Sequence, residues 1–256
     1  MKNSREIQSQ QIWKNSVYVS KYIEDFRGAV PYAVDQIEIM LDAISANTNS
    51  VKSFADLGCG NGILAGAILL KYPEAFGTVV DFYEPVLEEA KQQLIDYVSN
   101  LNFVVSDLSD PKWIKSIKKN VPFDVVVSGY TTHHLSNKRK KELYMEIFKM
   151  LKPGGIFINI DRVLPEGPVI AKMENRVLVE NIREFNKKKG VIKTTREIVK
   201  EYAEFISSKA DIPLPAGVQL KWLSEIGFEQ VTVFFRAYIG LVFGGVKPKL
   251  KTNSKS

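Results

Sequence analysis

The stretch Phe54–Gly62, Phe-Ala-Asp-Leu-Gly-Cys-Gly-Asn-Gly, decides the fold of this 256-residue chain. It has the pattern of a buried strand end followed by three glycines at alternate positions. The apolar run Ile63–Leu70 that comes next predicts a helix. Glycines permit a sharp turn and let a ligand approach the main chain, and the N–H groups at the start of the helix then face that ligand. The stretch therefore predicts a strand-loop-helix unit that binds a nucleotide-type ligand.

The spacing of the three glycines narrows the class of ligand. A dinucleotide fingerprint, G-x-G-x-x-G, would need a glycine at Ile63, and a P-loop would need Lys-Ser or Lys-Thr after the glycines. Asp56, two residues before Gly58, would repel a pyrophosphate but suits a cationic ligand that carries an amino group. The resulting D-L-G-C-G-N-G pattern closely resembles motif I of the class I S-adenosylmethionine (SAM) dependent methyltransferases.

Four further segments match that family in order and at typical distances. They are two strands with acidic ends, Thr78–Phe82 and Phe103–Asp107, a fourth strand, Phe123–Tyr130, and an L-x-P-G-G turn into a fifth, Met150–Phe157. Asp81 lies 21 residues after Gly60, where an open α/β sheet places a carboxylate for a ribose diol, although NAD enzymes share this feature. Because five motifs follow one another over residues 51–161, the resemblance implies SAM as the cofactor.

The resemblance also implies which residues contact the cofactor. Asp56 and the glycine loop would lie at its methionine side, Asp81 at the ribose and Asp107 at the adenine amino group. Arg27 is a candidate partner for the SAM carboxylate or for an acidic substrate, and a surface arginine is the alternative. The full set of expected contacts is Asp56, Gly58, Gly60, Asn61, Gly62, Asp81, Phe82, Asp107, Leu108, Ser128 and Arg27.

The order of elements predicts an α/β fold with a doubly wound, mainly parallel, seven-stranded Rossmann-like sheet. Strands and helices alternate along residues 51–161. The expected strands are 52–57, 77–82, 102–106, 122–128 and 155–161, and the expected helices are 61–71, 85–98, 111–119 and 138–151. After a helix at 216–226, residues 228–246 alternate in β fashion with a turn near Ala237. This hairpin resembles the antiparallel end of a class I methyltransferase sheet.

Two helical additions accompany this core. Residues 4–46 read as helices before the first strand, and helices at 168–188 and 193–208 form an insertion after the fifth. Ligands bind beyond the carboxyl ends of such strands, so the insertion is expected to act as a lid that excludes water. The expected parts of one domain, 1–256, are an arm (1–48), a SAM-binding core (49–162), the lid (163–212), a final helix and hairpin (213–246) and a basic tail (247–256).

Composition limits the class of protein. Hydrophobic residues make up 45% and charged residues 25%, which is typical of a soluble globular protein. No apolar run approaches the roughly 18–20 residues of a membrane span, and the polar start shows no signal peptide. The single Cys59 excludes an intramolecular disulfide and a C-x-x-C metal site. A cytoplasmic protein without a membrane partner is expected.

The chain carries a net charge of +6, and its pI is about 9.1, which raises the question of a nucleic-acid partner. The basic residues lie in short clusters such as Lys138–Lys141 and Lys187–Lys189. Solvated helix ends explain such clusters as well as an RNA surface does. A small-molecule acceptor is therefore the leading expectation, with nucleic acid as the alternative.

The candidates for catalysis follow the fourth strand. His133 and His134 are the only histidines in the chain, and either can take a proton from an acceptor hydroxyl or amine. His133 is favoured, although a histidine that merely packs against the following turn is the alternative. Tyr130 either lines the methyl pocket or packs. Methyl transfer from a sulfonium chiefly requires alignment, so a dedicated base is optional.

Several methyltransferase chemistries are excluded by what the motifs lack. Ser128–Thr131 replaces the N-P-P-Y segment of amino-methylating DNA enzymes. The cysteine nucleophile of cytosine C5 methylation and the several cysteines of arsenic methylation are absent. Asp161 is the lone carboxylate near the end of the fifth strand, so no metal is expected.

The leading hypothesis is a methyltransferase that moves the SAM methyl group to a small molecule. One alternative is a tRNA-modifying methyltransferase or an enzyme of the carboxy-SAM synthase group, which the arm and the hairpin loosely resemble. A non-catalytic SAM-binding partner subunit and an NAD-binding protein are further alternatives. The methyl acceptor and the oligomeric state stay open.

Overall fold

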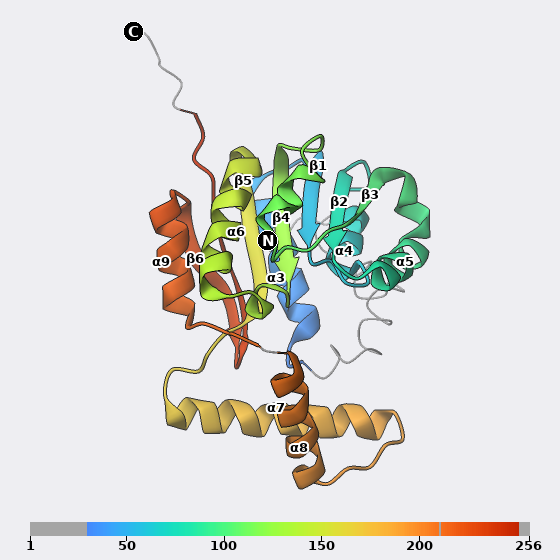
Figure 1. The fold of residues 1–256 in the computed structure, drawn as a ribbon, viewed down its shortest axis with the longest axis vertical. Helices are drawn as coiled ribbons and strands as arrows, with labels where there is room; N and C mark the ends of the chain where they lie inside the picture. The colour runs from blue at the N-terminus through green and yellow to red at the C-terminus, as the bar shows by residue number, and fades with distance from the viewer. Residues whose placement is uncertain (1–29, 210, 251–256) are drawn as a thin grey trace, which may run out of the picture.

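One seven-stranded sheet organises the structure (Figure 1), a computed structural model that describes residues 30–209 and 211–250. The strand order is β3-β2-β1-β4-β5-β7-β6, and β7 runs antiparallel to both of its neighbours, β5 and β6. The strands are β1 Ser53–Leu57, β2 Phe76–Asp81, β3 Leu101–Val105, β4 Phe123–Gly129, β5 Leu151–Arg162, β6 Glu229–Ala237 and β7 Gly240–Val246. The predicted Rossmann-like sheet with an antiparallel last strand is confirmed.

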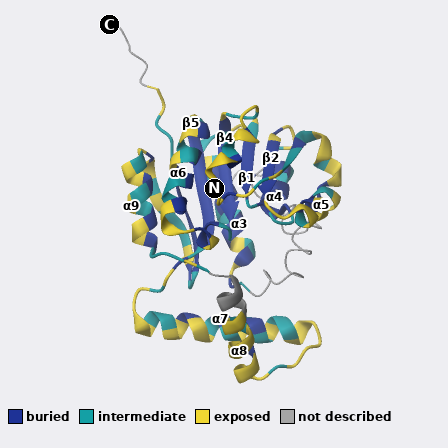
Figure 2. Ribbon diagram, viewed as in Figure 1, coloured by how far each residue is buried: buried dark blue, intermediate teal, exposed yellow. Residues whose placement is uncertain are grey.

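Helices cover both faces of this sheet. They are α3 Ala33–Asn47, α4 Ile63–Lys71, α5 Glu84–Gln93, α6 Asn137–Met150, α7 Pro168–Lys188, α8 Thr195–Lys209 and α9 Ala216–Ile226, with the 3-10 helices η2 Ile95–Asn100, η3 Pro111–Lys115 and η4 Thr132–His134. Two apolar clusters form the core, one under α3, α4 and α5 and the other under η3, α6 and α9. Figure 2 shows the resulting central layer of buried strands. Strands buried on both faces explain the continuous apolar runs in the sequence.

The helix predicted at 111–119 is wrong, because only a 3-10 turn forms at Pro111–Lys115. Two side chains one turn apart, Trp113 and Ile117, are buried there, and the Trp113 indole donates to Glu146 at 2.7 Å. Ile114 packs partly buried beside them, and the positions that follow Ile117 are lysines. A longer amphipathic helix therefore gains nothing from packing.

Two boundaries also differ from the prediction. The helix expected at 85–98 ends at Gln93 and continues as η2, where Leu94 is buried against Gly62. The fifth strand begins at Leu151 rather than 155, since the L-x-P-G-G segment is a strand irregularity rather than a turn before the strand. Gly154, at a φ of 81°, donates its N–H to Lys247 and so joins this irregularity to the end of β7.

The helices α7 and α8 form a separate layer beyond the carboxyl ends of the parallel strands (Figure 1). They pack on each other through Leu178, Ile182 and Ile198. The helices predicted at 168–188 and 193–208 are thus present. The residues of the predicted arm before residue 30 lie outside the described part of the chain. Among the described residues, no helix is long and apolar enough to span a membrane.

A carboxylate at the opposite edge joins three strands of the sheet. Asp124 accepts hydrogen bonds from the backbone N–H groups of Lys52 and Ser53, both at 2.9 Å, and from Lys152 Nζ at 2.9 Å. Burial alone would raise the pKa of Asp124, but the hydrogen bonds from Lys152, Lys52 and Ser53 together lower it below its usual value. The ionised form therefore stabilises the fold.

We expect Asp124→Asn to lower the free energy of unfolding at pH 7 by about 1–3 kcal/mol, as for losing charge-assisted hydrogen bonds. A carboxyl whose folded pKa lies below its unfolded value of about 3.9 stabilises the fold above that pH, and the contribution disappears as the pH falls through the folded pKa. Urea unfolding from pH 7 down to pH 3 should show the difference shrinking below about pH 4. The exposed Asp96→Asn is the control, and an equal loss at every pH would contradict the assignment.

Candidate functional site

The cofactor loop takes its shape from glycines in left-handed conformations. The φ angles are 70° at Gly58, 53° at Gly60 and 81° at Gly62. The N–H groups of Gly58 and Cys59 both donate to the carbonyl of Val80, at 2.8 and 3.0 Å, so the loop folds back over the end of β2. A Cβ at Gly58 would lie 2.2 Å from Thr131 Oγ1. Only glycine combines this conformation with this close approach.

Two acids of the predicted set hold this loop in place. Asp56 is fully buried, and its Oδ2 accepts the N–H of Ala65 at 3.1 Å, so it ties β1 to the first turn of α4. Asp81 accepts the N–H of Gly60 on Oδ2 at 2.9 Å and that of Tyr83 on Oδ1 at 3.1 Å. Each carboxylate oxygen can accept more than one hydrogen bond, so Asp81 retains capacity for ribose hydroxyls.

The other predicted cofactor contacts lie in different surroundings. Phe82 is 71% exposed beside the loop, as expected of a residue that covers a ligand. Asp107 is exposed and accepts the N–H and Oγ of Ser109, both at 2.7 Å. The Leu108 side chain is buried in the core, and the Ser128 hydroxyl donates to the Leu57 carbonyl at 2.7 Å inside the sheet.

The last two predicted cofactor contacts are Asn61 and Arg27. Asn61 lies in the turn between Gly60 and Gly62. Arg27 lies outside the described residues. The side chains of Leu108 and Ser128 thus make contacts within the protein, and their contacts with the cofactor stay predictions.

The predicted catalytic residues lie just after β4. Tyr130, with a φ of 51°, donates its hydroxyl to Gln36 Oε1 at 2.8 Å and so faces α3. His133 lies in η4, with its Nδ1 atom 2.5 Å from Asp161 Oδ1 at the end of β5. The Asp161 carboxylate also accepts the Thr132 hydroxyl at 2.5 Å and the His133 N–H at 3.0 Å.

This hydrogen-bond network keeps a fully buried carboxylate ionised. Burial would raise the pKa of Asp161, but attraction to His133 and hydrogen bonds from His133, Thr132 and Arg162 outweigh burial and lower it. Nδ1 of His133 faces Asp161, so Nε2 is the ring nitrogen that makes no contact with this carboxylate.

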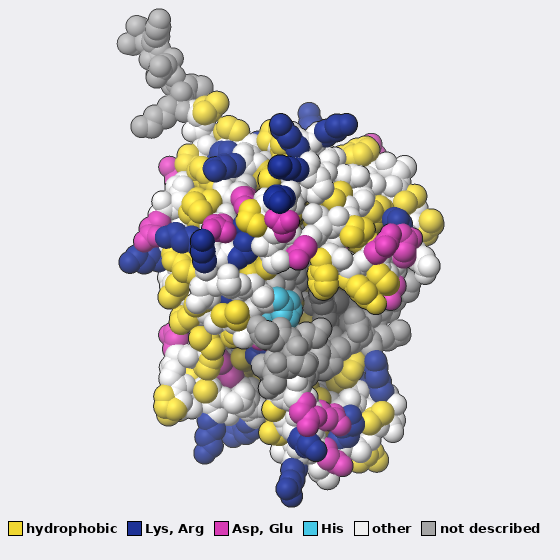
Figure 3. Space-filling view, in the orientation of Figure 1, with side chains coloured by type: hydrophobic (Ala, Val, Ile, Leu, Met, Phe, Trp, Pro, Cys, Tyr) yellow, Lys and Arg dark blue, Asp and Glu magenta, His cyan; other side chains and the backbone are white. Residues whose placement is uncertain are grey.

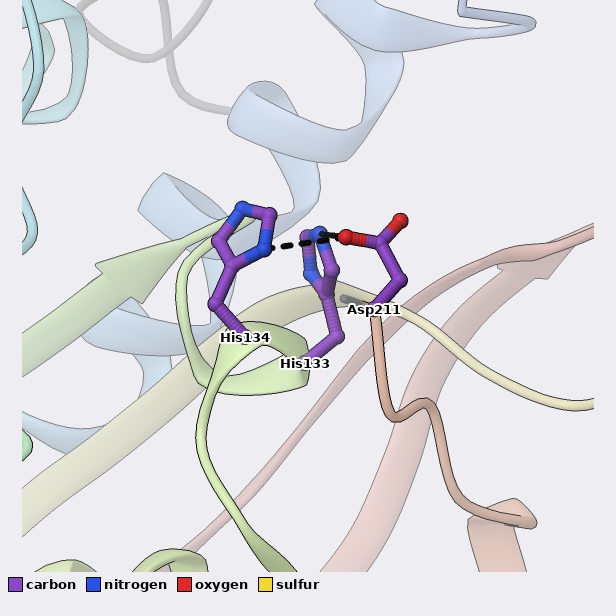
Figure 4. Close-up of side chains that lie close together, drawn as sticks. All are labelled: His133, His134 and Asp211. Atoms are coloured by element: carbon purple, nitrogen blue, oxygen red, sulfur yellow. Dashed lines mark ion pairs between the residues drawn. The ribbon is translucent and has the colours of Figure 1, made fainter. Parts of the chain in front are cut away.

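A segment far along the chain completes this cluster. Asp211, after α8, places Oδ1 3.0 Å from His134 Nδ1 and 3.8 Å from His133 Nε2 (Figure 4). Its Oδ2 atom accepts from Arg162 Nη1 at 2.6 Å. Figure 3 shows histidine surface in the hollow between the core and the α7–α8 layer, where the His134 side chain is 39% exposed.

Sequence reasoning did not find Asp211 or the buried lysine that supports it. Lys140 donates its Nζ to the carbonyl of Ile212, and the Ile212 N–H donates to the carbonyl of His133 at 2.7 Å. Burial lowers the pKa of Lys140, while nearby Asp161 acts in the opposite direction. No local pattern marks Asp211, because it lies 49 residues after Arg162. The one signal available was Lys140, a basic residue at an apolar position of α6.

Comparison with known proteins agrees with this geometry. A family model described as a methyltransferase domain matches residues 54–155. The carboxy-S-adenosyl-L-methionine synthase of Wolinella succinogenes is 27% identical over 216 residues, covering 81% of this chain and 82% of that protein. A malonyl-[acyl-carrier protein] O-methyltransferase of Ilyobacter polytropus is 24% identical over 59% of this chain and 54% of its own length.

Solved structures share the fold. The mitomycin 7-O-methyltransferase aligns with a TM-score of 0.55 and 15% identity over 93% of this chain, which spans 60% of that protein's length. Human N-acetylserotonin methyltransferase, solved with SAM, aligns with a TM-score of 0.54 and 16% identity over 96% of this chain and 66% of its own. The motifs, the sheet and the domain match together identify residues 54–155 as a class I SAM-dependent methyltransferase domain. SAM is its cofactor.

We expect Asp81→Ala to weaken SAM binding by roughly 1–3 kcal/mol, or about 5–150-fold, because a charge-assisted hydrogen bond to the ribose and the clamp on Gly60 are both lost. Isothermal titration with SAM and S-adenosylhomocysteine measures this change. Glu84→Ala, an exposed acid three residues further on, should bind SAM like the wild type. An unaltered affinity in Asp81→Ala would remove the ribose assignment.

Proposed function

We propose that this enzyme transfers the SAM methyl group to a small-molecule acceptor that binds beside His133. One observation carries the proposal: the cofactor loop and the histidine turn are in direct contact. Thr131 Oγ1 donates to the Gly58 carbonyl at 3.1 Å, and His133 follows two residues later. A cofactor on the glycine loop and an acceptor at His133 would therefore be neighbours, as methyl transfer requires.

The chemistry asks mainly for alignment of the acceptor, methyl carbon and sulfur, since the methyl group is already activated. We propose His133 and Tyr130 as the residues that line the acceptor position. Asp161 would hold the His133 ring in one orientation, through the 2.5 Å contact with Nδ1. The α7–α8 layer, which lies over this edge of the sheet, would exclude water from the reacting groups (Figure 1).

The nature of the acceptor is supported by the relatives rather than by the site alone. The named O-methyltransferases among the similar proteins act on small molecules and on an acyl-carrier protein. We propose that the methyl acceptor of this chain is a small molecule rather than a nucleic acid. We also propose a cytoplasmic location, in keeping with the single cysteine of the chain.

A second candidate function follows from the relatives that match over most of the chain. Several carry the name carboxy-SAM synthase, and the alignment with the Wolinella protein extends well beyond the methyltransferase domain. Modification of the SAM methyl group itself is therefore the alternative. The products separate the two, because methyl transfer releases S-adenosylhomocysteine, whereas carboxylation leaves a heavier SAM derivative that mass spectrometry identifies.

The test of methyl transfer is a screen of hydroxyl, amine, thiol and carboxylate acceptors with methyl-labelled SAM. In that assay we expect His133→Ala to lower kcat by roughly 10²-fold, because the acceptor loses its alignment, while the Kd for SAM stays unchanged. Lys138→Ala, whose side chain is 88% exposed at the start of α6, should retain wild-type activity. Full activity in His133→Ala, or the absence of S-adenosylhomocysteine with every acceptor, would contradict the proposal.

A further inference from the structure

We infer that His133, His134 and Asp211 form a binding site for one divalent transition-metal ion (Figure 4). This inference deepens the proposed function, on which it rests only for the position of the acceptor. The ion site itself depends only on the geometry of the three side chains. It is a site that the sequence did not predict, since Asp211 joins the two histidines only in the folded chain.

The three residues bring possible ligand atoms close together. One ligand atom from each residue lies within 4.8 Å of the other two, and Asp211 Oδ1 is 3.8 Å from His133 Nε2 and 3.0 Å from His134 Nδ1. Two ligands that share an ion at about 2.1 Å, with angles between about 90° and 130°, lie roughly 3.0–3.8 Å apart. Two imidazoles and one carboxylate are also the ligand set of mononuclear sites that keep open positions for a substrate.

A buried carboxylate oxygen of Asp211 that accepts no hydrogen bond among the described residues supports a cation at this position. The Asp211 side chain is only 2% exposed. Its Oδ1 atom is 3.0 Å from His134 Nδ1 and 3.8 Å from His133 Nε2, yet within the described part of the chain it accepts no hydrogen bond. Burying a carboxylate oxygen in this way is costly, and an ion between Oδ1 and the two nitrogens would remove the cost.

Neighbouring residues orient the three proposed ligands through hydrogen bonds, as residues around metal ligands commonly do. Asp161 lies 2.5 Å from Nδ1 of His133, which orients the ring and leaves Nε2 as the nitrogen that would bind the ion. Arg162, which follows Asp161 in the sequence, donates a hydrogen bond to Oδ2 of Asp211, so that Oδ1 can bind the ion. The backbone beside Asp211 is anchored in turn, since Ile212 donates to the His133 carbonyl and accepts from Lys140.

The charges around the site indicate what the ion would bind. Arg162 and Lys140 offset the two carboxylates of Asp161 and Asp211. A divalent ion would add positive charge in a partly buried place and would favour an acceptor that binds through an anionic oxygen. Such an ion holds the oxygen in position and favours its ionised form, which is the reactive one in methyl transfer. We therefore infer an oxygen acceptor.

The experiment is a Co²⁺ titration of the full chain without an affinity tag, followed by visible absorption, with bound metal counted by elemental analysis after loading with Zn²⁺. The chain suits this test, because it has only two histidines and one cysteine, which is buried. One ion per chain is expected. His134→Ala and Asp211→Asn should each lower the affinity at least 10-fold, while Glu180→Gln, an exposed acid of α7, should not.

SAM titration of each variant shows whether it is folded, since none of these residues belongs to the cofactor loop. An absence of stoichiometric binding, or equal affinity in His134→Ala and the wild type, would overturn the metal site. Such a failure is separate from failure of the proposed function. If only the metal site is wrong, the metal-free wild type still transfers methyl groups. If only the proposed function is wrong, the protein binds the metal ion but transfers no methyl group.

Discussion

The buried charge of Asp161 is the constraint on which the candidate site depends. A carboxylate at the dry end of β5 is tolerated only when donors surround it. Here the donors are the Thr132 hydroxyl, the main-chain and ring N–H groups of His133, and the N–H of Arg162. Because three of these four belong to η4, satisfying the charge also determines the conformation of the turn after β4 and the direction of the His133 ring.

That turn connects the two halves of the site. On one side Thr131 packs against Gly58, so the position of η4 and the shape of the cofactor loop are coupled. On the other side the carbonyl of His133 receives the N–H of Ile212 and brings Asp211 to the histidines. The α7–α8 layer that leads to Asp211 has a small apolar cluster of its own, Leu178, Ile182 and Ile198. Limited burial of this kind gives an element low local stability.

Much of the fold could be predicted, because its signals are local. Glycines at alternate positions after a buried strand identify the loop, and acids at two strand ends identify the cofactor edge. The helix predicted at 111–119 was wrong because charge and spacing there resemble an amphipathic helix, yet only Trp113 and Ile117 are fully buried, with Ile114 packed partly buried beside them. Ser128 was predicted as a cofactor contact at the end of the fourth strand, but its hydroxyl donates to the Leu57 carbonyl of the neighbouring strand. Such a contact depends on register between strands, which no single segment encodes.

The sequence by itself determined the class of fold and the cofactor loop, and it singled out the two adjacent histidines as candidates. Each of these is written within a few residues, through glycine conformation, strand periodicity and the rarity of histidine in this chain. Only the tertiary structure decided what the histidines face. Asp161, Lys140 and Asp211 come from β5, α6 and the segment after α8, and they meet because buried charges must find partners across the fold.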